Sequence, residues 1–145
     1  MTSISVSGTL FDPCACPAGF SRCAGRCLTR LDQLLTYTEA ERQCTQLGAH
    51  LAVPRSEEEN QCANSGTVVP AWLGITDVLT ENRFLGADGC GSVPSVGAMW
   101  GFQQPNSFGD QDFVSTGWSR WNDRDGSDLC QSLCQLPLCY QPACD

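Results

Sequence analysis

The chain has 145 residues, a mass of 15.6 kDa and a formal net charge of −8 at pH 7, from 16 acidic residues and 8 basic residues that are all arginine. This length fits one domain, and 41% hydrophobic with 17% charged residues is typical of a globular chain rather than a disordered one. An acidic chain without a basic cluster is a poor nucleic-acid binder, and no apolar run reaches the roughly 18 residues of a membrane span.

Eleven cysteines predict an oxidising, extracellular location, in which a secreted chain keeps its disulfides. The first ten residues lack the basic start and long apolar stretch of a signal peptide, so we expect a leader that is removed from a longer precursor. Because eleven is odd, at least one thiol is free or joins another chain in a disulfide-linked homo-oligomer. Cys144, next to the C-terminus, is the candidate.

The chain divides into an N-terminal arm, residues 1–13, and one domain, residues 14–145. The arm is rich in Ser and Thr and is predicted to be loose. Residues 14–27 are rich in Cys, Gly and Pro, which predicts loops and turns held by disulfides.

A first helix is predicted after the loop region. Thr38-Glu-Ala-Glu41 reads as a capping box at its start, and Gly48 is a typical residue to follow its end. Between them Ala40, Cys44 and Leu47 share one face of a helix, which we expect to be buried.

A second, shorter helix is predicted to start at Ser56-Glu-Glu-Glu59, another capping box with acidic residues in the first turn, and to end before Ser65-Gly66. Ala71-Trp-Leu-Gly-Ile75 then reads as a buried strand.

Residues 76–112 carry few strand signals and many Gly, Pro, Asn, Asp and Ser residues, and so long an irregular stretch is usually functional or disordered. Short strands are predicted near Phe113–Val114, Ser119–Trp121 and Leu136–Tyr140. Helices first and a small antiparallel sheet later indicate an α+β fold.

Side chains with oxygen donors are concentrated in and after this irregular stretch, and no histidine accompanies them. Carboxylates and amide carbonyls are the ligands that Ca²⁺ prefers. The alternative is that these residues simply populate solvated turns. The candidate metal ligands are Asp77, Glu81, Gln104, Asn106, Asp110, Asp112, Asn122 and Asp123.

Several short motifs follow one another along about residues 14–141. They are Cys16–Phe20 with Cys27, Tyr37–Glu41 with Cys44, Gly48–Ala52, Ser56–Glu59, Trp72–Ile75, Trp100, Gln104–Asn106, Trp121–Asp123 and Leu136–Cys139. Taken together, these motifs resemble those of the C-type lectin-like domain, in the order and roughly the spacing of that family. The resemblance implies two helices, two small antiparallel sheets and a long Ca²⁺-binding loop region, all stapled by disulfides.

The resemblance also implies a principal site in which Ca²⁺ binds the sugar. Its ligands would be Gln104, Asn106, Asn122 and Asp123. One further acid normally comes from the segment before the second sheet, and the sequence leaves Gln111, Asp112 and Asp110 as alternatives for that position. An auxiliary Ca²⁺ site would map to Asp77, Glu81 and Asp112.

Two departures affect the sugar site. Mannose-type members carry Glu-Pro-Asn and galactose-type members Gln-Pro-Asp, whereas Gln104-Pro-Asn106 has neither carboxylate, which should weaken Ca²⁺ binding. Phe108 stands where galactose-type members often place an aromatic residue that stacks on the sugar, and the alternative is that it packs the loop. On this basis a galactose-like ligand is favoured.

For the disulfides, the resemblance implies Cys16–Cys27 and Cys44–Cys139. The position that usually starts a further bridge holds Phe113, so Cys90 is the expected replacement partner for Cys130 or Cys134.

The sequence therefore predicts a secreted, Ca²⁺-dependent carbohydrate-binding protein that recognises glycans or glycoproteins, with a role in innate immunity by analogy with the family. The alternative is a structural or surface-binding scaffold for protein, mineral or ice, assembled through intermolecular disulfides. No set of nucleophile, base and orienting residue is evident, so we do not expect an enzyme.

Overall fold

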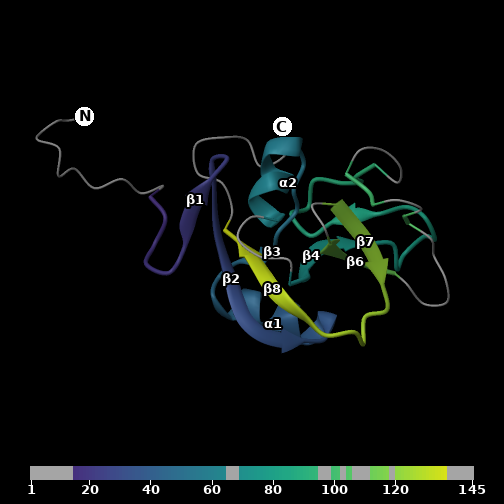
Figure 1. Cartoon of the computed structure of the whole chain (residues 1–145), viewed down its shortest axis with the longest axis horizontal. Coiled ribbons are helices and arrows are strands. Elements are labelled where there is room, and N and C mark those ends of the chain that lie inside the picture. Colours follow the sequence, from purple (N-terminus) through teal and green to yellow (C-terminus); the bar gives the residue numbers. More distant parts are fainter. Residues whose placement is uncertain are drawn as a thin grey trace, which may run out of the picture.

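The computed structural model describes residues 15–64, 69–94, 99–101, 104–105, 112–117 and 120–136. Within these residues two helices flank a sheet of eight short strands, as the α+β prediction requires (Figure 1). The elements are β1 Ser21–Cys23, β2 Arg26–Leu35, α1 Tyr37–Gln46, β3 His50–Leu51, α2 Glu57–Asn64, β4 Ala71–Thr76, β5 Leu85–Gly86, β6 Phe113–Gly117, β7 Arg120–Arg124 and β8 Cys130–Gln135.

The sheet has the strand order β1-β2-β8-β4-β6-β7, with β3 paired to β8 and β5 paired to β4. The pairing of β4 with β8 is parallel, and the other pairings are antiparallel. The two small sheets that the sequence predicts are thus joined into one through β4 and β8.

Helix α1 begins two residues before the predicted capping box. Thr36 is the N-cap: its hydroxyl accepts the Glu39 N–H and its own N–H donates to the Glu39 carboxylate. Because β2 ends at Leu35, the helix starts as soon as the strand stops, and the ring of Tyr37 enters the core. Thr36–Glu39 and Thr38–Glu41 both begin with Thr and end with Glu, so the capping-box pattern alone does not distinguish the two possible helix starts.

The end of α1 confirms the role of Gly48, which has a φ of +75° and donates its N–H to Thr45 O. Ala40 and Cys44 are buried as predicted. Leu47 is 46% exposed, contrary to the prediction, because the helix ends at Gln46 and Leu47 is already the C-cap. Helix α2 matches the predicted start, with the Glu59 N–H donating to the Ser56 hydroxyl, and it ends at Asn64.

Two strands differ from the sequence predictions. The ten residues of β2 carry two arginines and an aspartate and are mostly half-buried, so they show no apolar alternation that predicts a strand. The last strand lies at Cys130–Gln135, five or six residues before the predicted one at 136–140. Its alternation is hidden because cysteine, serine and glutamine occupy buried positions.

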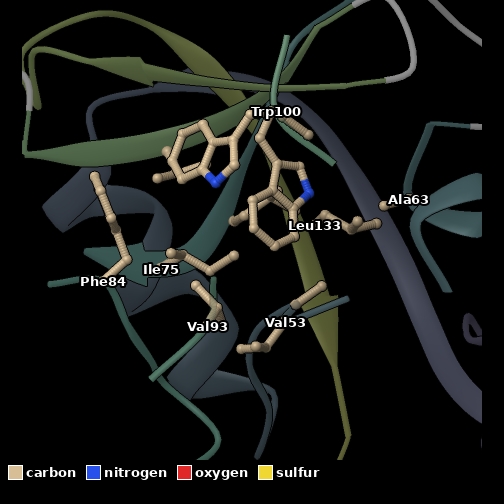
Figure 2. Packing of buried hydrophobic residues seen from close by; sticks show 12 residues of the cluster. Val53, Ala63, Ile75, Phe84, Val93, Trp100 and Leu133 are labelled. Atoms are coloured by element: carbon tan, nitrogen blue, oxygen red, sulfur yellow. The ribbon is translucent and has the colours of Figure 1, made fainter. Parts of the chain in front are cut away.

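Three tryptophans anchor the core. Trp100 and Trp121 belong to the larger cluster of buried side chains. This cluster also contains Ile75 of β4, Leu133 of β8 and Ala63 near the end of α2 (Figure 2). Trp72 belongs to a second cluster, with Tyr37 and Cys44, between α1 and the sheet. In the part of the chain that the structure describes, no helix combines the length and the apolar character that crossing a membrane requires.

Three disulfides link the described cysteines. Cys16–Cys27 closes the N-terminal loop as predicted. The bridge from α1 is Cys44–Cys134, not Cys44–Cys139, because α1 packs on β8 and Cys134 lies buried in that strand. The third, Cys23–Cys62, joins β1 to α2 and was not predicted.

Cys130 and Cys90 also differ from the prediction. Cys130 is buried and is the unpaired cysteine among the described residues, so it does not pair with Cys90. Cys90 is disulfide-bonded, and since the other described cysteines are accounted for, its partner lies outside the described residues. Cys139 and Cys144 lie outside them too.

Candidate functional site

Three of the predicted principal-site residues lie together, and we call Gln104, Asn122 and Asp123 the amide site. The Asp123 N–H donates to Gln104 Oε1 at 3.2 Å, which joins two segments 19 residues apart. Asn122 lies beside Gly101, where an added Cβ would be 2.9 Å from Asn122 Oδ1 and 3.5 Å from Gln104 Cγ. The absence of a side chain at Gly101 therefore lets both amides approach the same place.

Strand β7 presents the two residues of the amide site that follow Trp121. It pairs with β6 in the register Val114 with Asp123 and Ser115 with Asn122. Asp123 is 3% exposed and Asn122 is half-buried. The peptide bond between Gln104 and Pro105 is cis. Of the other residues predicted for this site, Asn106, Phe108 and the alternatives Asp110 and Gln111 lie outside the described residues.

A second group of predicted ligands also comes together, and we call Asp77, Glu81 and Asp112 the carboxylate cluster. One carboxylate oxygen from each lies within 4.8 Å of the other two. Asp77 directly follows β4 and Asp112 directly precedes β6, and the Asp77 N–H donates to Asp112 O at 3.0 Å. Asp112 thus lies beside the two residues with which the resemblance grouped it in the auxiliary site.

Local backbone geometry explains how the turn after β4 folds back. Asn82 has a φ of +65°, in the left-handed region that Asn tolerates better than most residues. Its N–H donates to Asp77 Oδ2 at 2.8 Å. This turn brings Glu81 close to Asp77 while Glu81 itself stays exposed.

Asp77 is the unusual member of the carboxylate cluster. It is 2% exposed, and its Oδ1 is buried without a hydrogen-bond partner. Burial, and then the negative charge of Glu81, raise the pKa of Asp77, while hydrogen bonds from the Asn82 N–H and with Asp112 oppose that change. A buried oxygen without a partner is costly unless something positive neutralises it. The donor set, all carboxylate oxygen, fits a Ca²⁺ ion.

The loop that follows β5 is held by Arg55, a residue that no sequence motif indicated. Its guanidinium donates to both carboxylate oxygens of Asp88, at 2.7 and 2.8 Å, and to the carbonyls of Gly91 and Ser92. The Asp88-Gly89 turn is visible in the sequence, but nothing in the spacing connects it to a residue 33 positions earlier.

Comparison with known proteins matches residues 33–136 to the model of the Lectin C-type domain family. Among curated relatives, C-type lectin domain family 4 member M of Symphalangus syndactylus is 26% identical over 132 residues, and human CD209 antigen is 27% identical over 131 residues. Each match covers 88% of this chain but 31% of the relative, so the chain spans about a third of the length of these relatives.

Solved structures agree with this result. The mouse scavenger receptor C-type lectin carbohydrate-recognition domain has a TM-score of 0.74 at 22% identity and covers 83% of this chain and 97% of that one. The herring type II antifreeze protein has a TM-score of 0.72 at 28% identity and covers 86% of this chain and all of that one. Since the matched family model spans most of the chain, the protein belongs to the C-type lectin domain family.

Proposed function

We propose that the chain is a Ca²⁺-dependent carbohydrate-binding protein whose sugar site is the amide site. The observation that carries this proposal is the hydrogen bond from the Asp123 N–H to Gln104 Oε1, with Asn122 beside them. Amide oxygens from two separate segments thus lie near each other and beside the backbone of Asp123, which supports a preorganised ion site.

Gln104, Asn122 and Asp123 would hold the ion, together with Asn106 and Asp110 from the neighbouring segment. Bound Ca²⁺ would supply open coordination positions for two neighbouring hydroxyls of a sugar. The side chains of this site then orient the sugar: the Asn122 amide can donate to a hydroxyl, and carboxylate oxygens of Asp123 can accept from one. Phe108 is proposed to contact the apolar face of a galactose-like ring.

The carboxylate cluster is proposed as a second Ca²⁺ site that stabilises the loop region. Its buried Asp77 Oδ1 without a partner supports this assignment. The cluster has three carboxylates, whereas the described residues of the amide site have one, that of Asp123. This difference favours tighter ion binding at the cluster. An affinity of about 10⁻⁴–10⁻³ M, typical of extracellular modules, is expected for the amide site.

Glycans or glycoproteins are the proposed partners, and the disulfides support a secreted, extracellular location. A binding role without enzymatic activity is part of this proposal. The structure of a related domain, cow CD23, was solved in the presence of a GlcNAc2Man3 oligosaccharide, at 24% identity. Weak binding of one sugar would gain strength if several copies act together. A role in innate immunity is part of this proposal.

A glycan array with and without Ca²⁺ tests the proposal. We expect retention of terminal galactose-type glycans in millimolar Ca²⁺ and complete release by a chelator. Binding that the chelator leaves unchanged, or no binding to any glycan, would contradict it.

Surface binding without sugar is the second candidate function. The similarity to the herring type II antifreeze protein, at 28% identity over its whole length, favours it, as does the lack of a carboxylate at Gln104. A chain of this second type would give a blank glycan array in Ca²⁺ and would bind ice, mineral or protein instead, with disulfide-linked oligomers on a non-reducing gel.

A further inference from the structure

Asn60 of α2 is a fully buried polar side chain, 1% exposed, that reaches the strand bearing the amide site. Its Oδ1 accepts the indole N–H of Trp121 at 3.0 Å, 61 residues further along the chain, and also the Asn64 side-chain N–H at 3.3 Å. Trp121 is itself 1% exposed, so without Asn60 its N–H would be buried and without this acceptor.

Trp121 connects both halves of the amide site through its backbone. It directly precedes Asn122 and Asp123 in β7. Its N–H donates to Met99 O at 2.6 Å, and its carbonyl accepts the Gly101 N–H at 2.8 Å. Gly101 in turn accepts the N–H of Gln104 at 2.9 Å. Trp121 is therefore connected, through neighbouring residues or backbone hydrogen bonds, to every described residue of the amide site.

The rings add to this connection. Trp121 packs edge to face on Trp100, with ring centroids 5.3 Å apart and an interplanar angle of 83°. Trp100 lies in the 99–101 segment and belongs to the larger core cluster, as does Ala63 of α2 (Figure 2). The indole of Trp121 is thus fixed by one hydrogen bond at its edge and by ring packing.

Helix α2 is fixed in position by two links to the β1–β2 hairpin. A capping hydrogen bond also stabilises its N-terminus. Cys62 forms the disulfide with Cys23. Glu59 pairs with Arg26 at 3.1 Å, and the side chains of this pair are 14% and 10% exposed. The Glu59 N–H also donates to the Ser56 hydroxyl. Asn60 lies between Glu59 and Cys62 on this helix, and its side chain makes the hydrogen bond to Trp121.

We propose that Asn60 is a positioning residue that sets the geometry of the amide site through the Trp121 indole, an inference that rests on the proposed function. Removing this hydrogen bond frees the indole to shift, and the alignment of Asn122 and Asp123 with Gly101 and Gln104 is then lost. Ion and sugar affinity fall by more than the loss of global stability explains.

Trp72 provides a matched control. Its indole N–H donates to Leu35 O at 2.8 Å and its side chain is fully buried, so Trp72→Phe removes the same kind of group from an equally buried place. Its ring packs on Tyr37 and Phe113 in the second core cluster, away from Trp121.

The experiment compares Trp121→Phe, Asn60→Leu, their combination and Trp72→Phe in the full chain. Hydrogen exchange of the Asp123 N–H, measured without Ca²⁺ and normalised to global stability, reports the geometry of the amide site. Calorimetric Ca²⁺ titration reports the Ca²⁺ affinity of the amide site. It is done in variants that also carry Asp77→Asn, which disables the carboxylate cluster. We expect Trp121→Phe and Asn60→Leu each to weaken Ca²⁺ binding about tenfold and to lower Asp123 protection, with no further loss when combined.

Trp72→Phe is expected to lower stability and leave both readouts at the wild-type values. The positioning role is overturned if Trp72→Phe and Trp121→Phe change Ca²⁺ affinity and Asp123 protection equally. It is also overturned if the effects of Asn60→Leu and Trp121→Phe add up in the combined variant. If the wild type binds neither Ca²⁺ nor sugar, the proposed function is wrong, and Asp123 exchange alone decides whether Asn60 positions these residues.

Discussion

The rings of Tyr37 and Phe113 pack against each other with their centroids 4.4 Å apart and an interplanar angle of 35°. Tyr37 opens α1 and Phe113 opens β6, so this contact joins the helix to the part of the sheet that leads to both candidate sites. Phe113 also lies edge-on to Trp72, at 6.5 Å between centroids. An aromatic group thus occupies the position where the family resemblance predicts a cysteine.

Phe113→Ala should therefore lower the free energy of unfolding by about 3 kcal/mol, because it removes ring contacts and leaves a cavity beside Tyr37 and Trp72. Phe113→Leu, which fills more of the space, should cost about 1 kcal/mol. Urea unfolding followed by tryptophan fluorescence measures both. If the two variants were equally stable, the ring contact would not be what stabilises this junction.

The amide site is tested directly by Asn122→Ala with Asp123→Ala. The double variant should lose glycan binding entirely and keep its far-UV circular dichroism, because neither side chain belongs to a hydrophobic core cluster. Asp125→Ala, which removes one exposed carboxylate two residues further on, controls for the loss of charge. Normal sugar binding by the double variant would show that the site lies elsewhere.

The carboxylate cluster should make the Ca²⁺-free protein less stable as pH rises. The pKa of Asp77 is raised in the folded state, so the folded protein holds this proton more tightly than the unfolded chain does. Stability is then lost as pH rises from about 3.9, the ordinary aspartate value, through the raised pKa.

Asp77→Asn should remove this pH dependence and stabilise the protein in a chelator, while in millimolar Ca²⁺ the wild type should be the more stable of the two. Urea midpoints measured from pH 4 to 8, with chelator and with Ca²⁺, check both expectations. A wild type that Ca²⁺ does not stabilise at neutral pH would mean that the cluster holds no ion.

The ion pair of Arg55 with Asp88 should respond to pH in the opposite direction. Burial acts to raise the pKa of Asp88, but the Arg55 hydrogen bonds, the Cys90 N–H and the Arg55 charge outweigh it, so the net shift is downward. The stability that the ion pair contributes is present above the pKa of Asp88 in the unfolded chain. It is lost as the pH falls through the lower pKa of Asp88 in the folded protein.

Arg55→Gln should cost about 1–3 kcal/mol at pH 7 and flatten the loss of stability in acid, because Asp88 then keeps no guanidinium partner. Arg120→Gln is the control, since its pair with Glu57 is exposed and is worth at most about 1 kcal/mol. Chemical unfolding at pH 3.5, 5 and 7 separates the two variants. If both variants lost a similar free energy of unfolding, burial of the Arg55–Asp88 pair would add nothing to stability.

Cys130 should be inert in the folded protein. Burial, with a smaller contribution from the charge of Asp128, raises the pKa of its thiol to about 11, and its side chain is fully buried. Alkylation at pH 8 followed by peptide mass spectrometry should leave Cys130 unmodified in buffer and modify it fully in denaturant. Modification in the native protein at the rate of a free thiol would contradict the buried position.

The sequence determined what local chemistry can encode. Capping residues and Gly48 fixed the two helices to within two residues, and the apolar run Ala71–Ile75 fixed β4. The residue types at Asp77, Glu81, Gln104, Asn122 and Asp123 indicated oxygen ligands before any fold was known, because ligand chemistry depends on side-chain identity.

Tertiary structure alone decided which of these groups meet. The family resemblance paired Cys44 with Cys139, whereas the packing of α1 on β8 brings Cys44 to Cys134. The contacts of Arg55 with Asp88 and of Asn60 with Trp121 join residues 33 and 61 positions apart, and no local pattern records such distances. The reason is physical: sequence periodicity reports which face of an element is buried, whereas the partner of a buried polar group is fixed only when separate elements pack together.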